Sequence, residues 1–512
     1  MRDVHELRRH PRDPETVNFG YVLMGKKRAR DTEDQATAAP RPSAPDAKKR
    51  KSSDDAPGAG VCDDVLDNIF TRLPTGTAVA SMVLSKHHHH LICSSEFRRL
   101  HFRLSQPLVN PHIAYIVISK FHGFHVAGAG HNSDAPMHTL GGIYYEMKYI
   151  NTCNGILLFA REREMKPPTC ILWNPALAND KKELSIPAYT RKRDDYRRLQ
   201  PTCRNDAGDY SILGLGYGKR SKSYKLLISY RQMQRETLLS KPPQSTYCKE
   251  LQVYTLGTDR QTPRLVKFLS QGMDLEISQE SLFIDGVIYL LFYKKQILAF
   301  DIDNEKLTTI EQPGSSWYPC ENRITSELMS FSGRPCLVKN YGGKRALWIL
   351  TVDLQWERRC VFKVEDDLIF CPIKGVWDYN GVLFLFLYNK TGESKLILHK
   401  VTTKKMLMKN LSYDLTPKGS HYSFCWDYKP TLLSPRSIIE ELNQDVNLLG
   451  TSKHIDIVKA KRPFNKLEKR KVPKAALATI RFMDYLIHIM EKLPGNMQEI
   501  KMPLLNSEEL VN

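Results

Sequence analysis

Residues 61–104 carry the clearest helical pattern in the chain. Apolar residues recur there at i, i+3, i+4 and i+7, which predicts one apolar helix face. They are Leu66, Ile69, Phe70 and Leu73. We expect Pro74 to end this helix and two or three more short helices to follow it. A serine cap at Ser94 or Ser95 is expected to open one of these later helices. Because roughly 40 residues cannot bury a core alone, the module is expected to lean on a partner or on the next domain.

From about residue 110 to 433 the pattern changes to short apolar runs separated by Gly, Asp, Asn and Pro, which predicts an all-β region. A unit of turn glycine, apolar strand and second apolar strand recurs. It starts at Gly286, Gly333 and Gly381, at nearly equal intervals along the chain. A period of about 40 to 50 residues is typical of four-stranded propeller blades. Gly155 resembles an earlier copy, and its longer interval to Gly286 suggests three units with shorter connections.

Composition indicates a soluble multidomain chain. It has 512 residues, 41% of them hydrophobic, and its 11 cysteines form no C-x-x-C pair, which is typical of free thiols in a reducing compartment. The N-terminus has no signal-peptide pattern, and no apolar run is long enough to span a bilayer.

The net charge of +19 lies largely in two short segments. Residues 26–51 hold nine Lys and Arg against four acidic residues, and residues 453–474 hold nine against two, giving +5 and +7. Their composition is typical of solvated tails or linkers. The first segment resembles a two-part nuclear localisation signal. Its candidate residues are Lys26, Lys27, Arg28, Arg30, Lys48, Lys49, Arg50 and Lys51.

The helical module resembles the F-box of plant F-box proteins. The matching residues are Asp63, Asp64, Val65, Leu66, Ile69, Arg72, Leu73, Pro74, Ser85, Lys86, Leu91, Ile92, Ser94 or Ser95, and Phe97. Val61 and Cys62 depart from the family's opening Leu-Pro, and His88 stands where the family has Trp. The resemblance implies docking on the Skp adaptor of a cullin-RING ubiquitin ligase. The apolar positions it assigns to that contact are Val65, Leu66, Ile69, Leu73, Pro74, Val83, Leu91 and Ile92.

The β region resembles the F-box associated interaction domain. The matches begin with Cys-Asn-Gly at 153–155 and Trp-Asn-Pro-Ala at 173–176, and continue through Gly-x-Gly-Tyr at 214–217 and Tyr-Lys-Leu at 224–226. Later strands match at Leu251, Val253, Tyr254 and Gly257, and at Asp285, Gly286, Phe300 and Asp301. This resemblance implies a β-propeller-like domain that binds a target protein.

We therefore predict an α+β multidomain protein, with a small helical F-box, a large all-β propeller-like domain and C-terminal helices. The predicted parts are a disordered basic tail (1–60), the F-box (61–104), the β domain (110–433), a short helix (434–450), a basic linker (451–473) and an amphipathic helix (474–493). The last carries an apolar seam of little more than two heptads, which fits packing on the β domain or a partner helix.

Residue patterns for catalysis are missing from the sequence. GLGYG at 214–218 does not fit a phosphate loop and is expected to be a hairpin turn, while Trp173 is expected to pack between blades. Four adjacent histidines, His87–His90, point in different directions on a helix and so predict solvated surface instead of a metal site. We predict no enzyme activity, cofactor or metal.

The leading hypothesis is a substrate-receptor subunit of an SCF-type ubiquitin ligase, located in the nucleus, the cytoplasm or both. Its partners would be the Skp adaptor, the cullin scaffold and a target protein. We expect no association with a membrane. Two alternatives stay open. One is a nuclear protein that binds nucleic acid through its basic tails, and the other is a β scaffold whose degenerate F-box has lost the adaptor.

Overall fold

The computed structural model describes residues 62–439 with gaps. The gaps are 105–113, 119–121, 127–137, 141–143, 145, 163–167, 178–179, 188–207, 235–245, 258–261, 273–276, 293–295, 314–324, 342, 365–370, 380, 389–393, 411–420 and 426–427. Contacts divide the chain into Met1–Gly60 and Val61–Asn512, and the described residues all belong to the second unit. The predicted basic tail, the candidate nuclear signal, the basic linker and the helix at 474–493 lie outside them.

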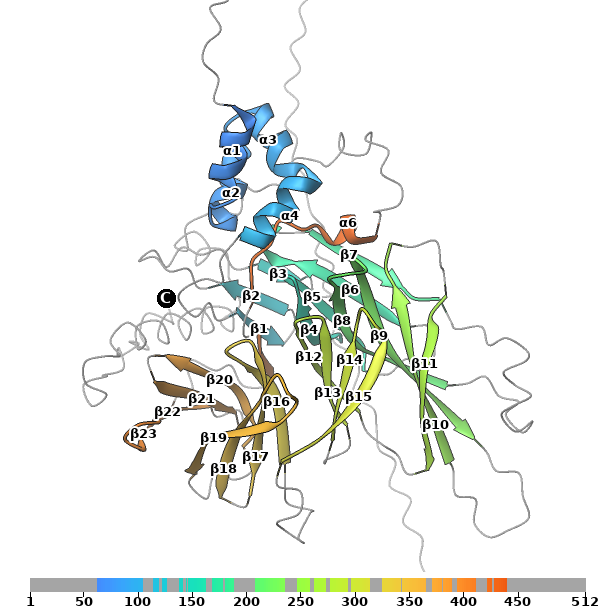
Figure 1. Ribbon diagram of the computed structural model, residues 1–512, viewed down its shortest axis with the longest axis vertical. Coiled ribbons are helices and arrows are strands. Elements are labelled where there is room, and N and C mark those ends of the chain that lie inside the picture. Colours follow the sequence, from blue (N-terminus) through green and yellow to red (C-terminus); the bar gives the residue numbers. More distant parts are fainter. Residues whose placement is uncertain are drawn as a thin grey trace, which may run out of the picture. The chain divides into compact units, whose positions relative to one another are not determined.

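The module at 62–104 consists of four short helices (Figure 1). They are α1 (Asp63–Phe70), α2 (Thr75–Ser81), α3 (Lys86–Cys93) and α4 (Ser95–Leu104). Serine caps open the last two, because the Ser85 and Ser94 hydroxyls accept from the backbone N–H groups of His88 and Phe97 at 3.1 Å each. The predicted cap at Ser94 is therefore correct.

The sequence predicted that Pro74 ends the first helix, but the helix ends four residues earlier. α1 ends at Phe70, and the Thr71 hydroxyl donates to the Asp67 carbonyl at 2.6 Å in the turn that follows. Pro74 instead precedes α2 as its cap residue. Its fixed φ suits that position, where no helical N–H is needed.

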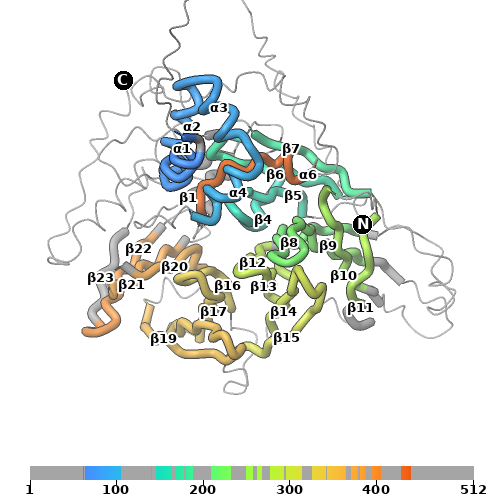
Figure 2. Tube along the Cα trace, turned by 45° about the horizontal axis from the view of Figure 1, so that its top comes forward, coloured from blue at the N-terminus to red at the C-terminus, as the bar shows by residue number. Residues whose placement is uncertain are grey.

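In the described residues, the strands form six antiparallel four-stranded sheets (Figures 1 and 2). Five of them use four consecutive strands. These are β4 (Lys148–Cys153), β5 (Ile156–Ala160), β6 (Thr169–Asn174) and β7 (Asp180–Ser185); β8 (Gly208–Gly218), β9 (Ser223–Gln234), β10 (Thr246–Thr255) and β11 (Arg264–Gly272); β12 (Ile277–Ile284), β13 (Val287–Phe292), β14 (Gln296–Asp301) and β15 (Lys306–Glu311); β16 (Thr325–Phe331), β17 (Arg334–Asn340), β18 (Lys344–Leu350) and β19 (Trp356–Lys363); and β20 (Ile373–Tyr379), β21 (Val382–Tyr388), β22 (Ser394–Lys400) and β23 (Lys405–Asn410).

The sixth sheet joins the two ends of the β domain. It has the order β24-β1-β2-β3, in which the late strand β24 (His421–Cys425) pairs with β1 (Ala114–Ile118), followed by β2 (His122–Val126) and β3 (His138–Leu140). Contacts between end strands run from sheet to sheet and return to the start. The contacting pairs are β4 with β8, β8 with β12, β12 with β16, β16 with β20, β20 with β24, and β24 with β4. This mostly β arrangement is consistent with a propeller-like domain.

The recurring glycines occupy the predicted turns. Asn154 and Gly155 link β4 to β5 with φ of 50° and 77°, and Asp285 and Gly286 link β12 to β13 with 48° and 86°. Such two-residue turns need positive φ at both positions, which glycine adopts at no steric cost. The periodic unit is therefore one sheet, and its glycine marks the first hairpin.

The interpretation of the interval from Gly155 to Gly286 as three units is wrong. Between these two hairpins lies one sheet, β8–β11, so the interval covers two units. The interval is long because β8, β9 and β10 have 11, 12 and 10 residues, and because the connection from β7 (ending at Ser185) to β8 (beginning at Gly208) is long instead of short. GLGYG also differs from its predicted turn, since it forms the end of β8, and the turn follows at 219–222.

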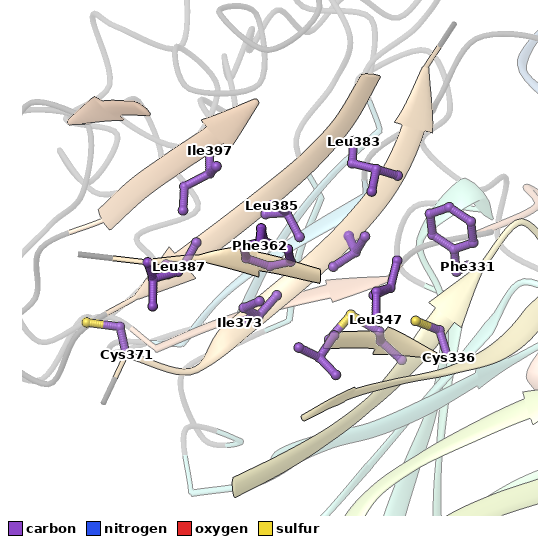
Figure 3. Close-up of a cluster of buried hydrophobic side chains, with 14 of the residues drawn as sticks. Phe331, Cys336, Leu347, Phe362, Cys371, Ile373, Leu383, Leu385, Leu387 and Ile397 are labelled. Carbon is purple, nitrogen blue, oxygen red and sulfur yellow. The ribbon is translucent and has the colours of Figure 1, made fainter. Parts of the chain in front are cut away.

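Apolar side chains fill the space between neighbouring sheets. Figure 3 shows the cluster between β16–β19 and β20–β23, which includes Phe331, Leu347, Phe362, Leu385 and Ile397. Gly214 and Gly216 on β8 allow the β8–β11 sheet to pack closely on the next sheet. A Cβ at Gly216 would lie 2.4 Å from Ile302 Cδ1. None of the helices described here combines the length and apolarity needed to cross a membrane.

Candidate functional site: the exposed apolar face of the helical module

Four large apolar side chains in the first half of the helical module remain exposed. Val65 and Ile69 on α1 keep 48% and 51% of their surface exposed, and Val83 and Leu84, after α2, keep 65% and 67%. We call these four residues the exposed apolar set. Val65 and Ile69 lie one turn apart on α1, and Val83 and Leu84 are adjacent, so the set consists of two exposed apolar pairs. Grouped apolar side chains on a surface are candidates for protein contacts.

Beneath this set lies a compact core. Its buried members are Phe70, Ala78, Val79, Met82, Ile92 and Phe97, joined by Leu177 and Leu432 from the β domain. The module therefore does not bury its core alone, which agrees with the expectation from its size.

The structure divides the predicted adaptor-contact residues into two groups. Val65, Ile69, Pro74 and Val83 are exposed, whereas Leu66, Leu73 and Leu91 are half-buried against the core. Ile92 has no exposed surface, so it supports the helices from within. Leu84 was not singled out from the sequence, although its place beside Val83 after the α2 apolar run could have indicated it.

His88, the residue in place of the family Trp, is half-buried. Its ring meets the buried Phe70 ring edge-on, with 5.1 Å between centroids. The His88 ring thus covers part of the module's core at Phe70.

The histidine run does not assemble a metal site in the described residues, where no group of three His, Cys, Asp or Glu could hold an ion. His89 Nε2 and Cys93 Sγ, one helical turn apart, lie 3.8 Å from each other. His87, His89 and His90 are exposed, as predicted for solvated helix surface. No disulfide joins the seven cysteines whose side chains the structure describes, which are Cys62, Cys93, Cys153, Cys170, Cys336, Cys360 and Cys371.

His101 is a buried polar residue of this module that the sequence did not point to. Its Nε2 lies 2.9 Å from the Leu73 carbonyl, and its ring stacks on Phe97. Burial lowers the pKa of His101, the bond to Leu73 opposes this, and the nearby Lys429 lowers it further. The neutral ring with a proton on Nε2 donates to that carbonyl and ties α4 to the α1–α2 turn.

Motif residues of the β domain are mostly buried, so they hold the sheets together. Trp173 is 1% exposed, which confirms that it packs inside. Lys225 is 5% exposed, and its Nζ donates to the Ile302 carbonyl at 2.8 Å and to Glu305 at 2.9 Å, across two sheets. Arg264 binds the same carboxylate through both terminal nitrogens, at 2.9 and 2.6 Å.

One half-buried carboxyl, that of Glu327, lies between β16 and β20. Glu327 accepts from the Ile373 backbone N–H at 2.9 Å, and burial raises its pKa to about 7 against the opposing charge of Arg345. Burial likewise lowers the pKa of the Arg345 guanidinium. Both groups therefore serve the packing between two sheets.

The structure thus joins a small helical module with exposed apolar side chains to a large antiparallel β domain. The sequence matches the family model of the F-box associated beta propeller domain over residues 115–413. Since that match covers more than half of the chain, this chain belongs to the F-box proteins that carry this domain. F-box proteins in general partner the Skp adaptor in SCF complexes.

No curated protein matches the chain. Solved structures with similarity include BamB from Moraxella catarrhalis, at 11% identity, covering 57% of this chain and 86% of that one, with a TM-score of 0.27. A puromycin-hydrolyzing peptidase from Mycobacterium tuberculosis gives 8% identity, coverage of 59% and 54%, and a TM-score of 0.21. The acylaminoacyl peptidase of Pyrococcus horikoshii has 10% identity, with 60% of this chain and 47% of that one covered and a TM-score of 0.29. The chain spans about half the length of these two peptidases, and similarity at this level carries no functional argument.

Proposed function

We propose that this protein is the substrate-receptor subunit of an SCF-type cullin-RING ubiquitin ligase. The F-box docks on the Skp adaptor, and the β domain, which we propose to be a closed six-bladed propeller, holds a target protein. The exposed apolar set carries the proposal, because its side chains are available for contact on the module that the family uses for the adaptor. This role needs no catalytic residue in the chain.

The physical effect is tethering. A receptor bound at once to the ligase and to a target raises the local concentration of target lysines near the ubiquitin-loaded enzyme. Each interface can be modest, since the geometry supplies the rate. We place the protein in the nucleus, the cytoplasm or both; the candidate nuclear signal lies in residues 26–51, outside the described part.

Calorimetric titration with purified Skp adaptor tests the docking half. Ile69→Asp puts a charge into the exposed apolar set and should weaken binding by about tenfold or more, as expected for an interface anchor. Val361→Asp is the matched control, because Val361 is 47% exposed on the β domain. Equal affinity of the two variants would contradict the proposed surface.

The choice between ligase receptor and scaffold depends on His88 and Cys62. Cys62 precedes α1 without a side-chain cap. A folded wild-type chain that does not bind the adaptor would favour the scaffold alternative. His88→Trp is the informative partner variant, because it restores the family residue beside Phe70.

A further inference from the structure

The segment after the last strand crosses from the β domain to the F-box. Residues 428–434, which we call the strap, follow the β24 sheet and lead into α6 (Pro435–Ile439). Figures 1 and 2 show the strap in orange, passing between the F-box helices and the β4–β7 sheet. It contacts both.

On the F-box side, three neighbouring strap residues make separate contacts. Lys429 Nζ donates to the Phe102 carbonyl at 2.7 Å and lies 4.7 Å from the centre of the Phe102 ring. The Thr75 hydroxyl donates to the Pro430 carbonyl at 3.2 Å. Leu432, which has no exposed surface, is part of the F-box core.

On the β side, the strap is anchored to β6 and to the first hairpin of the same sheet. The Asn174 amide donates to the carbonyls of Thr431 and Leu433, at 3.0 and 2.6 Å. Gly155 lies so close that an added Cβ would be 2.4 Å from the Lys429 carbonyl oxygen. Asn174 and Gly155 belong to the two family motifs of this sheet, so part of each motif serves the strap.

A charge cluster lies beside the same joint. Asp180, at the start of β7, interacts with the Ser434 hydroxyl and with two cations, Arg436 of α6 and Arg98 of α4. Burial raises the pKa of Asp180, and these three partners lower it. The F-box, the strap and the β domain thus share one polar contact region.

We propose that the strap holds the F-box folded against the β domain, so that the adaptor-docking face keeps one orientation toward the domain that binds the target. This inference deepens the proposed function and rests on it. The F-box core is too small to be stable alone, and Leu432 and Leu177 complete it from the β domain. A fixed joint serves the tethering role, because a loose one would spread the target over a larger volume.

A matched pair of glycine variants tests the strap in the full chain. Gly155 and Gly381 have the same φ of 77°, but nothing lies within 4 Å of a Cβ built at Gly381. Gly155→Ala and Gly381→Ala therefore strain the turn alike, and only Gly155→Ala pushes on the strap. Hydrogen exchange followed by mass spectrometry then reports on peptides of residues 62–104 and, as an internal reference, 296–311.

We expect the F-box peptides to exchange about tenfold faster in Gly155→Ala than in Gly381→Ala, while peptides from 296–311 exchange alike. Lys429→Met provides a milder second variant, because it removes the bond to Phe102 and keeps the aliphatic stem. Its control is Lys219→Met, at a side chain that is paired with Asp285 on the surface. Lys429→Met should raise F-box exchange about threefold over that control.

Equal exchange rates of the F-box peptides within the glycine pair and within the lysine pair would refute the proposed role of the strap. Adaptor binding by the wild-type chain is measured separately and decides the proposed function. A chain that shows the exchange difference but does not bind the adaptor would keep the strap and refute the ligase role.

Discussion

Single positions on the first helix separate surface from core. Ile69 and Leu66 lie one turn apart and share the apolar stripe seen in the sequence, but Ile69 is half exposed and Leu66 packs on the core. Periodicity identified the stripe because the helix repeat fixes which side chains share a face. It could not divide the stripe, because that division depends on how α2, α3 and Leu432 pack against the helix, and the pattern within one helix does not encode this packing.

Aspartate at these two positions should therefore act differently. Leu66→Asp places a charge against the core and should lower the free energy of unfolding by about 2–3 kcal/mol. Ile69→Asp should change it by no more than about 0.5 kcal/mol, because its side chain reaches solvent. Hydrogen exchange of F-box peptides across a urea series measures the change in the free energy of unfolding for both variants. Similar losses of stability would show that Ile69 belongs to the core.

Glu327 should give the β domain a specific pH dependence. Its folded pKa of about 7 lies above the ordinary value of 4.5, so its contribution to stability is full below pH 4.5 and is lost as pH rises through 7. Glu327→Gln keeps an oxygen that can accept from Ile373 and removes the ionisation. Relative to this variant, the wild type should lose up to about 3 kcal/mol between pH 4.5 and 8, measured by urea unfolding. A constant difference across that range would contradict a raised pKa.

At the scale of elements, the sheets repeat but are not equal. The nearly equal spacing of Gly286, Gly333 and Gly381 was predictable because successive sheets of similar strand length reuse one hairpin geometry. The β8–β11 sheet broke the count because its strands and the connection that leads into it are longer, and apolar alternation does not define where such strands end. The prediction of a turn at GLGYG was wrong for a related reason. Strand glycines that permit close packing of sheets look like turn glycines in sequence.

The Lys225–Glu305–Arg264 cluster joins two of these sheets. Glu305→Ala would leave Lys225 buried without its carboxylate, and we expect a loss of roughly 3 kcal/mol in the free energy of unfolding. The control is Glu311→Ala, because Glu311 is exposed at an edge strand and should cost less than about 1 kcal/mol. Guanidinium unfolding compares the two. Equal losses would mean that the cluster adds nothing to the packing of the sheets.

At the scale of the molecule, the last strand completes the first sheet. β24 pairs with β1 from Ala114 with Cys425 to Ile118 with His421. The all-β class was predictable from local turns and alternation. This pairing was not, because it joins the two ends of the β domain and no local pattern encodes such a distant contact.

Disrupting β24 should therefore affect both ends of the β domain. Ser423→Pro places a proline in β24 at the position paired with Ile116 and should destabilise the domain by about 3 kcal/mol, with faster exchange in β1 as well as β24. The comparison is Thr402→Pro in the turn that links β22 to β23. Exchange in β1 that remains at the wild-type rate would contradict this pairing.

Docking of the F-box on the Skp adaptor underlies the proposed role of the whole molecule. Size-exclusion chromatography with light scattering, on the full chain mixed with purified adaptor, measures this docking without intermediate steps. We expect one complex with the mass of a 1:1 assembly, which dissociates when Ile69 and Val83 are both changed to Asp. A folded wild-type chain that elutes at its own mass beside free adaptor would contradict the ligase role.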